Sequence, residues 1–314
     1  MERAVITFGE TLLDIIFQNG KVVDAHPGGA LLNSSVTLAR LGVPVRFISE
    51  TGDDPTGDMI LKFLENTGVD TQLIYRYANI NTGLALAFLD DRMEAHYSFY
   101  KQYPDKRMPE IPEVGVNGDY FLFGSSASRE PALQDTLNRL ITTFLNREGL
   151  IIYDPNFRSA HKHQLSETLP VIGKHLCTAD IVRASTDDLK YILGTESPGE
   201  MGEKILASGV QALILTDGPG PVRLFTQNLN LTVQVEKGPV KSTIGAGDTF
   251  NAALVYSLLK LKVNRKNLVH LDRESWQELI GFAGRCALTV CRSTRNYLSD
   301  SEARELLTRL PFGK

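Results

Sequence analysis

Short apolar segments of strand length alternate with segments of helical periodicity along most of this 314-residue chain. The strand-like segments read AVITF, VRFIS, DYFLFG, LIIYD, DIVRAS and QALILT. Such alternation is typical of parallel strands joined by crossover helices, because a parallel strand needs a long return connection. We therefore predict an α/β fold with a mostly parallel central sheet flanked by helices.

Several helix ends can be placed from single residues. Glycines follow helical segments at positions where a left-handed residue commonly ends a helix, namely Gly42, Gly68, Gly149, Gly194 and Gly209. Ser197 followed by Pro198 is typical of a helix N-terminus, with a capping hydroxyl and then a proline at the first helical position.

Residues 71–103 break the alternation, because TQLIYRY, TGLALAF and AHYSFY follow one another without a helical segment, and the turn DDRM separates the last two. Together with LLDIIFQNGKVVDA near the start, they predict a small β-sheet that covers one end of the main sheet as a lid. An antiparallel extension of the main sheet is the alternative. We expect residues 1–314 to form one domain, with the lid built from about 11–25 and 71–103.

Composition excludes several classes of protein. The formal net charge of −4 provides no basic surface for nucleic acid. No apolar run approaches the roughly 18 to 20 residues that span a bilayer. The opening MERAVITFGE lacks the apolar stretch of a signal peptide. We therefore expect a cytoplasmic protein without nucleic-acid or membrane partners.

The segment TIGAGDTFNAAL, residues 243–254, places a glycine-containing loop at the start of a helix. The first N–H groups of a helix lack intrahelical partners and lie at the positive end of its dipole, so an anion is stabilised there. Gly245 and Gly247 allow the backbone to approach such an anion closely. The dinucleotide fingerprint is excluded because Phe250 stands at its third glycine, and no P-loop pattern occurs.

Asp248 follows this loop directly. A carboxylate beside an anion site repels the ligand unless it faces another group, such as a hydroxyl that must lose a proton. Phosphoryl transfer needs both elements: positive dipoles around the migrating group and an acceptor for the proton of the attacking oxygen. The alternative is an ordinary first-turn acid that complements the helix dipole.

A second polar group is expected near the first strand. Gly28 and Gly29 precede a helix with Asn33 in or near its first turn, an arrangement that could seat a polyol. Asp14 follows the first strand, at the carboxyl end of the sheet where α/β proteins bind ligands. The alternatives are that the two glycines only form a tight turn and that Asp14 is an ordinary surface acid.

As a whole, the pattern resembles the ribokinase-like (PfkB) carbohydrate kinase family. GGALLNSSVTLARLG and GDDPTGD match its N-terminal signature, and TIGAGDTFNAAL matches its C-terminal one. The likeness continues through DPNFR, DIVRASTDDL and LTDGPG, so it covers nearly the whole chain. The resemblance implies a mostly parallel sheet flanked by helices, a β lid over the sugar, and ATP and Mg²⁺ as reactants.

The resemblance also implies roles for individual residues. The catalytic base would be Asp248, and the phosphoryl group would be held by the amides of Gly245, Ala246 and Gly247. The sugar would contact Asp14, Gly28, Gly29 and Asn33. The triphosphate and magnesium side would be formed by Ser185 and Asp188, where the family usually has Asn and Glu, with the shorter acid reaching the metal through water. The nucleotide-side loop would be Thr216, Gly218 and Gly220.

Two departures from the family pattern concern cations and nucleotide. Ser242 stands where the family usually has an Asp that helps to bind a monovalent cation, and the usual Gly-Ala pair is missing from VCRSTRNYLSD. The resemblance therefore does not extend to potassium activation, and the residues that contact adenine are not placed.

Only the segment DPNFR limits the choice of substrate, because it resembles the corresponding segment of fructokinases and of 2-keto-3-deoxygluconate kinases. Arg158 in this motif could bind a substrate carboxylate or form a structural ion pair. We favour fructose, while 2-keto-3-deoxygluconate, ribose, a nucleoside, a non-catalytic sugar or nucleotide sensor and a nicotinamide dehydrogenase stay open. The apolar GLALAF strand further suggests a homodimer that pairs through the lid.

Overall fold

The computed structural model describes residues 4–90, 95–104, 107–108, 119–157, 162 and 164–310. The main sheet has the strand order β14-β13-β12-β11-β10-β9-β1-β4-β5. Both β5 and β6 pair with β4, β5 with its start and β6 with its end. Neighbouring strands are parallel except in the pairs β12–β13 and β13–β14, which are antiparallel. This arrangement confirms the predicted fold class. The strands are β1 (Val5–Phe8), β4 (Val45–Gly52), β5 (Val69–Asp70), β6 (Ile74–Tyr77), β9 (Tyr120–Gly124), β10 (Leu150–Asp154), β11 (Ile181–Ser185), β12 (Ala212–Thr216), β13 (Val222–Thr226) and β14 (Asn230–Val233).

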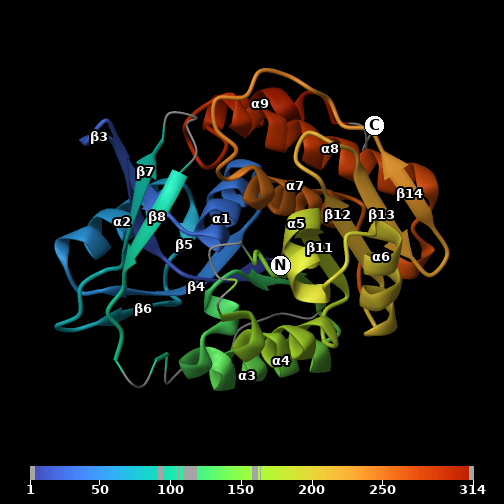
Figure 1. Ribbon diagram of the computed structural model, residues 1–314, viewed down its shortest axis with the longest axis horizontal. Coiled ribbons are helices and arrows are strands. Elements are labelled where there is room, and N and C mark those ends of the chain that lie inside the picture. The colour runs from blue at the N-terminus through green and yellow to red at the C-terminus, as the bar shows by residue number, and fades with distance from the viewer. Residues whose placement is uncertain are drawn as a thin grey trace.

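Helices cover both faces of this sheet, so its central strands are apolar without alternation. In β9, Tyr120 and Leu122 belong to one core cluster, while Phe121 and Phe123 belong to the other. The first cluster is covered by α1 (Ala30–Arg40), α2 (Pro55–Asn66), α7 (Ala246–Lys260), α8 (Arg273–Cys291) and α9 (Asp300–Leu307). The second is covered by α3 (Gln134–Asn146), α4 (Leu165–Leu176), α5 (Thr186–Leu193) and α6 (Pro198–Ala207). Figure 1 shows α7, α8 and α9 above the sheet and α3 and α4 below it.

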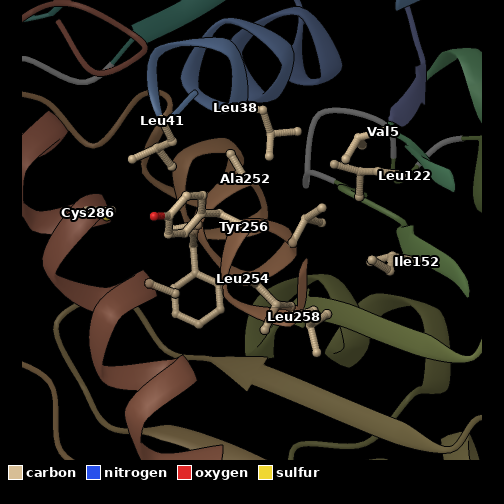
Figure 2. Close-up of a cluster of buried hydrophobic side chains, with 14 of the residues drawn as sticks. Val5, Leu38, Leu41, Leu122, Ile152, Ala252, Leu254, Tyr256, Leu258 and Cys286 are labelled. Carbon is tan, nitrogen blue, oxygen red and sulfur yellow. The ribbon is translucent and has the colours of Figure 1, made fainter. Parts of the chain in front are cut away.

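Helix α7 is the central helix of the first layer. Every residue from Asp248 to Leu258 is buried, the polar Thr249, Asn251 and Ser257 included, so the helix is enclosed on all sides. Figure 2 shows four of its side chains surrounded by residues from the sheet, α1 and α8: Ala252, Leu254, Tyr256 and Leu258 lie among Val5, Leu38, Leu41, Leu122, Ile152 and Cys286. The loop that precedes α7 is therefore attached to the best-packed helix in the fold.

A separate small sheet has the order β3-β2-β7-β8, which confirms the predicted lid sheet. Its strands are β2 (Leu12–Gln18), β3 (Lys21–Gly28), β7 (Leu84–Leu89) and β8 (Ala95–Tyr100). The assignment of TQLIYRY to the lid is wrong, because β6 pairs with β4 through Ile74–Tyr77. Ile74 packs against the core and the Tyr77 hydroxyl donates to Glu50 Oε2 at 2.9 Å, so this segment is held by the main sheet. Most of the predicted turn at 90–93 lies outside the described residues.

The predicted helix ends are confirmed with one exception. Positive φ angles occur at Gly42, Gly68, Gly194 and Gly209, and the Ser197 hydroxyl accepts from the Glu200 amide. At the end of α3, however, Glu148 takes the positive φ of 57° and Gly149 does not. A Cβ on Gly149 would lie 2.7 Å from the Phe144 ring, so glycine is required there for close packing. None of the helices within the described ranges is long and apolar enough to cross a membrane.

His175 of α4 is a titratable group inside the second core cluster. Its ring is fully buried against Phe123 and Tyr153, and one ring nitrogen donates to the Ser128 carbonyl at 2.8 Å. Burial lowers the pKa of His175 from 6.5 to about 4. The unfolded chain therefore binds a proton at this residue at a higher pH than the folded chain does.

We predict that acid destabilises the protein through His175. Because the folded pKa lies below the unfolded one, stability is complete above about pH 6.5 and is lost as the pH falls toward about 4. The loss amounts to about 3 kcal/mol at most. Urea unfolding between pH 7.5 and 4.5 would measure it, with His175→Asn to remove the titration and His270→Asn as an exposed control. Parallel pH curves for the wild type and His175→Asn would contradict the assignment.

Candidate active site

The parallel strands of the main sheet end at one edge, where most of the residues singled out from the sequence gather. A pocket at this edge is lined by residues of α1, of the loops after β9 and β10, and of α7: Ala30, Leu31, Ser34, Ser125, Asp154, Asn156, Asp248 and Asn251. The two halves of the chain thus meet at the carboxyl ends of the strands, which is the usual ligand position in such sheets.

Asp248 lies in the first turn of α7 and lines this pocket, with 4% of its surface exposed. The side-chain amide of Asn33 in α1 donates to its Oδ2 at 2.9 Å, and the Ser34 hydroxyl donates to its carbonyl at 3.0 Å. The carboxylate therefore faces the N-terminus of α1 and is not a solvated first-turn acid. Asn33 and Asp248, which the sequence singles out separately, are thus in direct contact.

The loop before Asp248 has the conformation of an open helix N-terminus. Gly245 is the N-cap of α7 and has a φ of 78°. Within the part of the chain that the structure describes, the amides of Gly245 and Gly247 donate to no backbone carbonyl, while the Ala246 amide donates to Thr243 O at 3.3 Å. Two of the three amides expected to hold a phosphoryl group are thus open, and the third makes a long bond.

Arg183 of β11 extends this anion site, and the sequence analysis did not identify it. A Cβ on Gly247 would lie 2.6 Å from Arg183 Nη1, so the guanidinium covers the loop directly. Arg183 is 8% exposed, donates to Asp154 Oδ2 at 3.0 Å, and donates to Thr216 Oγ1 at 2.7 Å. The only sign of this role in the sequence was a charged residue within the apolar segment DIVRAS.

Asp154 is a second buried acid that the sequence analysis left without a role. It ends β10 with 2% of its surface exposed. Besides the bond from Arg183, its Oδ2 accepts from the side-chain amide of Asn251 at 2.6 Å. Asp154 therefore links β10 and β11 to α7.

Ser185 and Asp188 form the capping box of α5 at the same edge. The Ser185 hydroxyl accepts from the Asp188 amide at 3.0 Å, and the Asp188 carboxylate accepts from the Ser185 amide at 3.3 Å. Burial raises the pKa of the Asp188 carboxyl to about 6, and the charge of Asp154 contributes to that rise. The two residues thus cap α5, and their predicted role at the triphosphate and magnesium stays a prediction.

The carboxylates at this edge of the sheet are candidate ligands for a magnesium ion. Among the described residues, no cluster of three or more His, Cys, Asp or Glu side chains could hold a metal. Magnesium that arrives with a nucleotide needs only one or two carboxylates besides phosphate oxygens and water. Asp188 and Asp154 are near enough to affect each other electrostatically, so they fit this smaller requirement.

The nucleotide-side loop connects β12 with the antiparallel strand β13. Thr216 ends β12 and holds Arg183, which places it beside the start of α7. Gly218 has a φ of 49°, and the Gly220 amide donates to Asp217 O at 2.7 Å, so the loop is a tight turn. The structure thus brings this loop to the edge where α5 and α7 begin.

The predicted sugar-binding residues lie between the lid and α1. Asp14 lies on β2 of the lid, and a Cβ on Gly28 would stand 2.1 Å from Asp14 Oδ2. Gly29 is the N-cap of α1 with a φ of 125°, and a Cβ there would stand 2.2 Å from Glu10 O. Asn296, a residue that the sequence analysis did not single out, donates to Asp14 Oδ2 at 3.1 Å. Arg158 lies outside the described residues.

Comparison with known proteins gives a consistent result. A fructokinase of Vibrio alginolyticus is 28% identical over 254 residues, which is 80% of this chain and 82% of that protein. A crystal structure of fructokinase with bound ATP from Xylella fastidiosa superposes with a TM-score of 0.83 at 22% identity, over 98% of this chain and 99% of the other. Fructokinase from Vibrio cholerae O395 with fructose, ADP and calcium ion has a TM-score of 0.86 at 21% identity, with the same coverage.

Those two superpositions show the fold. The family follows from the sequence, because residues 3–303 match the pfkB family carbohydrate kinase. This chain therefore belongs to the pfkB family of carbohydrate kinases.

Proposed function

We propose that this carbohydrate kinase transfers the γ-phosphoryl group of ATP to a primary hydroxyl of a small sugar, and that the sugar is fructose. The observation that carries the proposal is a buried carboxylate, Asp248, directly beside two open amides at a helix N-terminus. Support for fructose comes from the Vibrio alginolyticus relative and from the two neighbouring fructokinase structures, which contain ATP or fructose with ADP.

In this proposal Asp248 orients the attacking hydroxyl and accepts its proton, while Asn33 keeps the carboxylate directed into the pocket. The amides of Gly245 and Gly247 and the guanidinium of Arg183 surround the position where negative charge develops. Because these groups are fixed before the reaction, most of their contribution is positioning and electrostatic stabilisation.

Asp188 would hold Mg²⁺ through water, with Asp154 close by, and Ser185, Thr216, Gly218 and Gly220 would line the nucleotide side. The bound ion supplies positive charge to the phosphate oxygens. The guanidinium of Arg183 places a fixed positive charge beside the loop, and we propose no monovalent cation there.

We predict that Asp248→Asn binds sugar and ATP but turns over slowly. The variant keeps an oxygen for the bond from Asn33 and loses the proton acceptor, so kcat should fall about 10²- to 10⁴-fold, or roughly 3 to 5.5 kcal/mol of barrier. ADP release would be measured over a panel of fructose, ribose, 2-keto-3-deoxygluconate and a nucleoside. The panel also tests the substrate, because fructose should give the highest kcat/KM.

Asp135→Asn is the matched control for this prediction, because Asp135 is an exposed acid in the first turn of α3. It should leave kcat unchanged. Near-normal turnover of Asp248→Asn would exclude Asp248 as the base. Sugar binding without sugar-dependent ADP release in the wild type would indicate the sensor alternative.

The contact between Gly28 and Asp14 gives a second prediction. In Gly28→Ala the new methyl group would overlap Asp14 Oδ2, so the carboxylate must move. The KM for sugar should rise on the order of 10-fold or more, with the KM for ATP unchanged. Gly173→Ala is the matched control, because nothing lies within 4 Å of a Cβ at that helical position. An equal sugar KM for both variants would contradict the placement of Asp14.

We also propose pairing of two subunits through the lid. Several large apolar side chains on the lid are exposed, namely Val22, Val23, Phe88, Phe99 and Tyr100. Light scattering should give about twice the chain mass of 34.7 kDa. Tyr100→Asp should shift the protein to the monomer, whereas Val240→Asp, equally exposed but outside the lid, should not. A monomeric wild type would remove the proposal.

A further inference from the structure

Asn296 joins the sugar side of the site to the phosphate side. It follows α8 and is 1% exposed, and its Nδ2 donates to Asp14 Oδ2 at 3.1 Å. Its backbone lies against the start of α7, because a Cβ on Gly245 would stand 2.0 Å from Asn296 O. One buried residue thus contacts both the acid of the lid and the cap of the catalytic helix.

The chain on the C-terminal side of Asn296 is fixed by specific contacts. The Tyr297 ring packs 5.1 Å from the Arg40 guanidinium, and Arg40 also donates to Leu298 O. Ser299 then forms the capping box of α9. Asn296 is therefore presented from a rigid segment, as expected of a residue that positions another group.

The Asp14 carboxylate has a second neighbour in His26, which lies directly opposite it in the pairing of β3 with β2. Burial lowers the pKa of His26, and a side-chain hydrogen bond between His26 and Asn296 acts in the opposite direction. Asp24 Oδ2 lies 3.7 Å from Nδ1 of the His26 ring. Asn296 therefore contacts both members of this cross-strand pair, the Asp14 carboxylate and the His26 ring.

We propose that Asn296 is a positioning residue: its side-chain amide holds the Asp14 carboxylate in the orientation in which that acid binds the substrate. This inference rests on the proposed function, since it assumes that Asp14 binds the sugar.

Asn296→Asp tests the inference, because it keeps the shape of the side chain and replaces the donor by an oxygen. Two carboxylates about 3.1 Å apart repel unless they share a proton. At pH 8 the KM for D-fructose, or for the fastest sugar of the panel, should rise on the order of 10-fold, with kcat and the KM for ATP nearly unchanged. At pH 5.5 the increase should largely disappear.

The wild type measured in parallel accounts for other groups that respond to pH, including His26, whose burial lowers its pKa. Arg295→Ala is the neighbouring control, because the partly exposed Arg295 side chain forms an ion pair with Glu302 at 3.1 Å, and it should leave both KM values unchanged. If Asn296→Asp does not fold, Asn296→Ser serves instead, with the same selective loss of sugar affinity expected and without the pH dependence. Calorimetric titration with the sugar alone would confirm that the loss concerns sugar binding.

A sugar KM that is unchanged, or that changes together with kcat and the KM for ATP, would overturn the role of Asn296. A wild type that releases no ADP with any sugar would instead contradict the proposed function. In that case the calorimetric titration still decides whether Asn296 determines sugar binding.

Discussion

The hydrogen bond from Asn33 to Asp248 joins residues 215 positions apart and sets the geometry of the whole site. It connects the first turns of α1 and α7, which both begin at a glycine cap beside the carboxyl ends of the strands. The N-termini of two helices are thereby brought together, each with unpaired amides and a partial positive charge. In the proposed function the buried carboxylate between them is the group that accepts the proton.

The glycines around the site serve the protein's own polar groups as well as a ligand. Gly28 makes room for the Asp14 carboxylate, Gly245 for the Asn296 carbonyl and Gly247 for the Arg183 guanidinium. In each case a Cβ would lie at most 2.6 Å from the neighbouring atom. A glycine-rich sequence motif therefore indicates close approach, but it does not say which group approaches.

This distinction explains how much of the structure could be predicted. The parallel strands and the start of α7 follow from local patterns, because periodicity and caps are encoded by neighbouring residues. The contact between Asn33 and Asp248, 215 positions apart, does not. Arg183 and Asn296 could not be found in this way, since their partners lie on other strands and helices. The error at β6 has a similar cause: a two-residue period predicts a strand but does not specify which sheet it joins.

In the proposed function, the phosphate side and the sugar side of the site are supported by different parts of the fold. The phosphate side is attached to α7, which is buried over nearly its whole length, so its dipoles need little reorganisation when charge moves. The sugar side depends on Asp14, which lies on a sheet with several exposed apolar residues and no helix of its own. The Asn296–Asp14 hydrogen bond ties the lid to the body of the protein. If Asp14 binds the sugar as proposed, the position of the lid and the orientation of this acid are coupled, because Asp14 lies on the lid sheet and is held by Asn296.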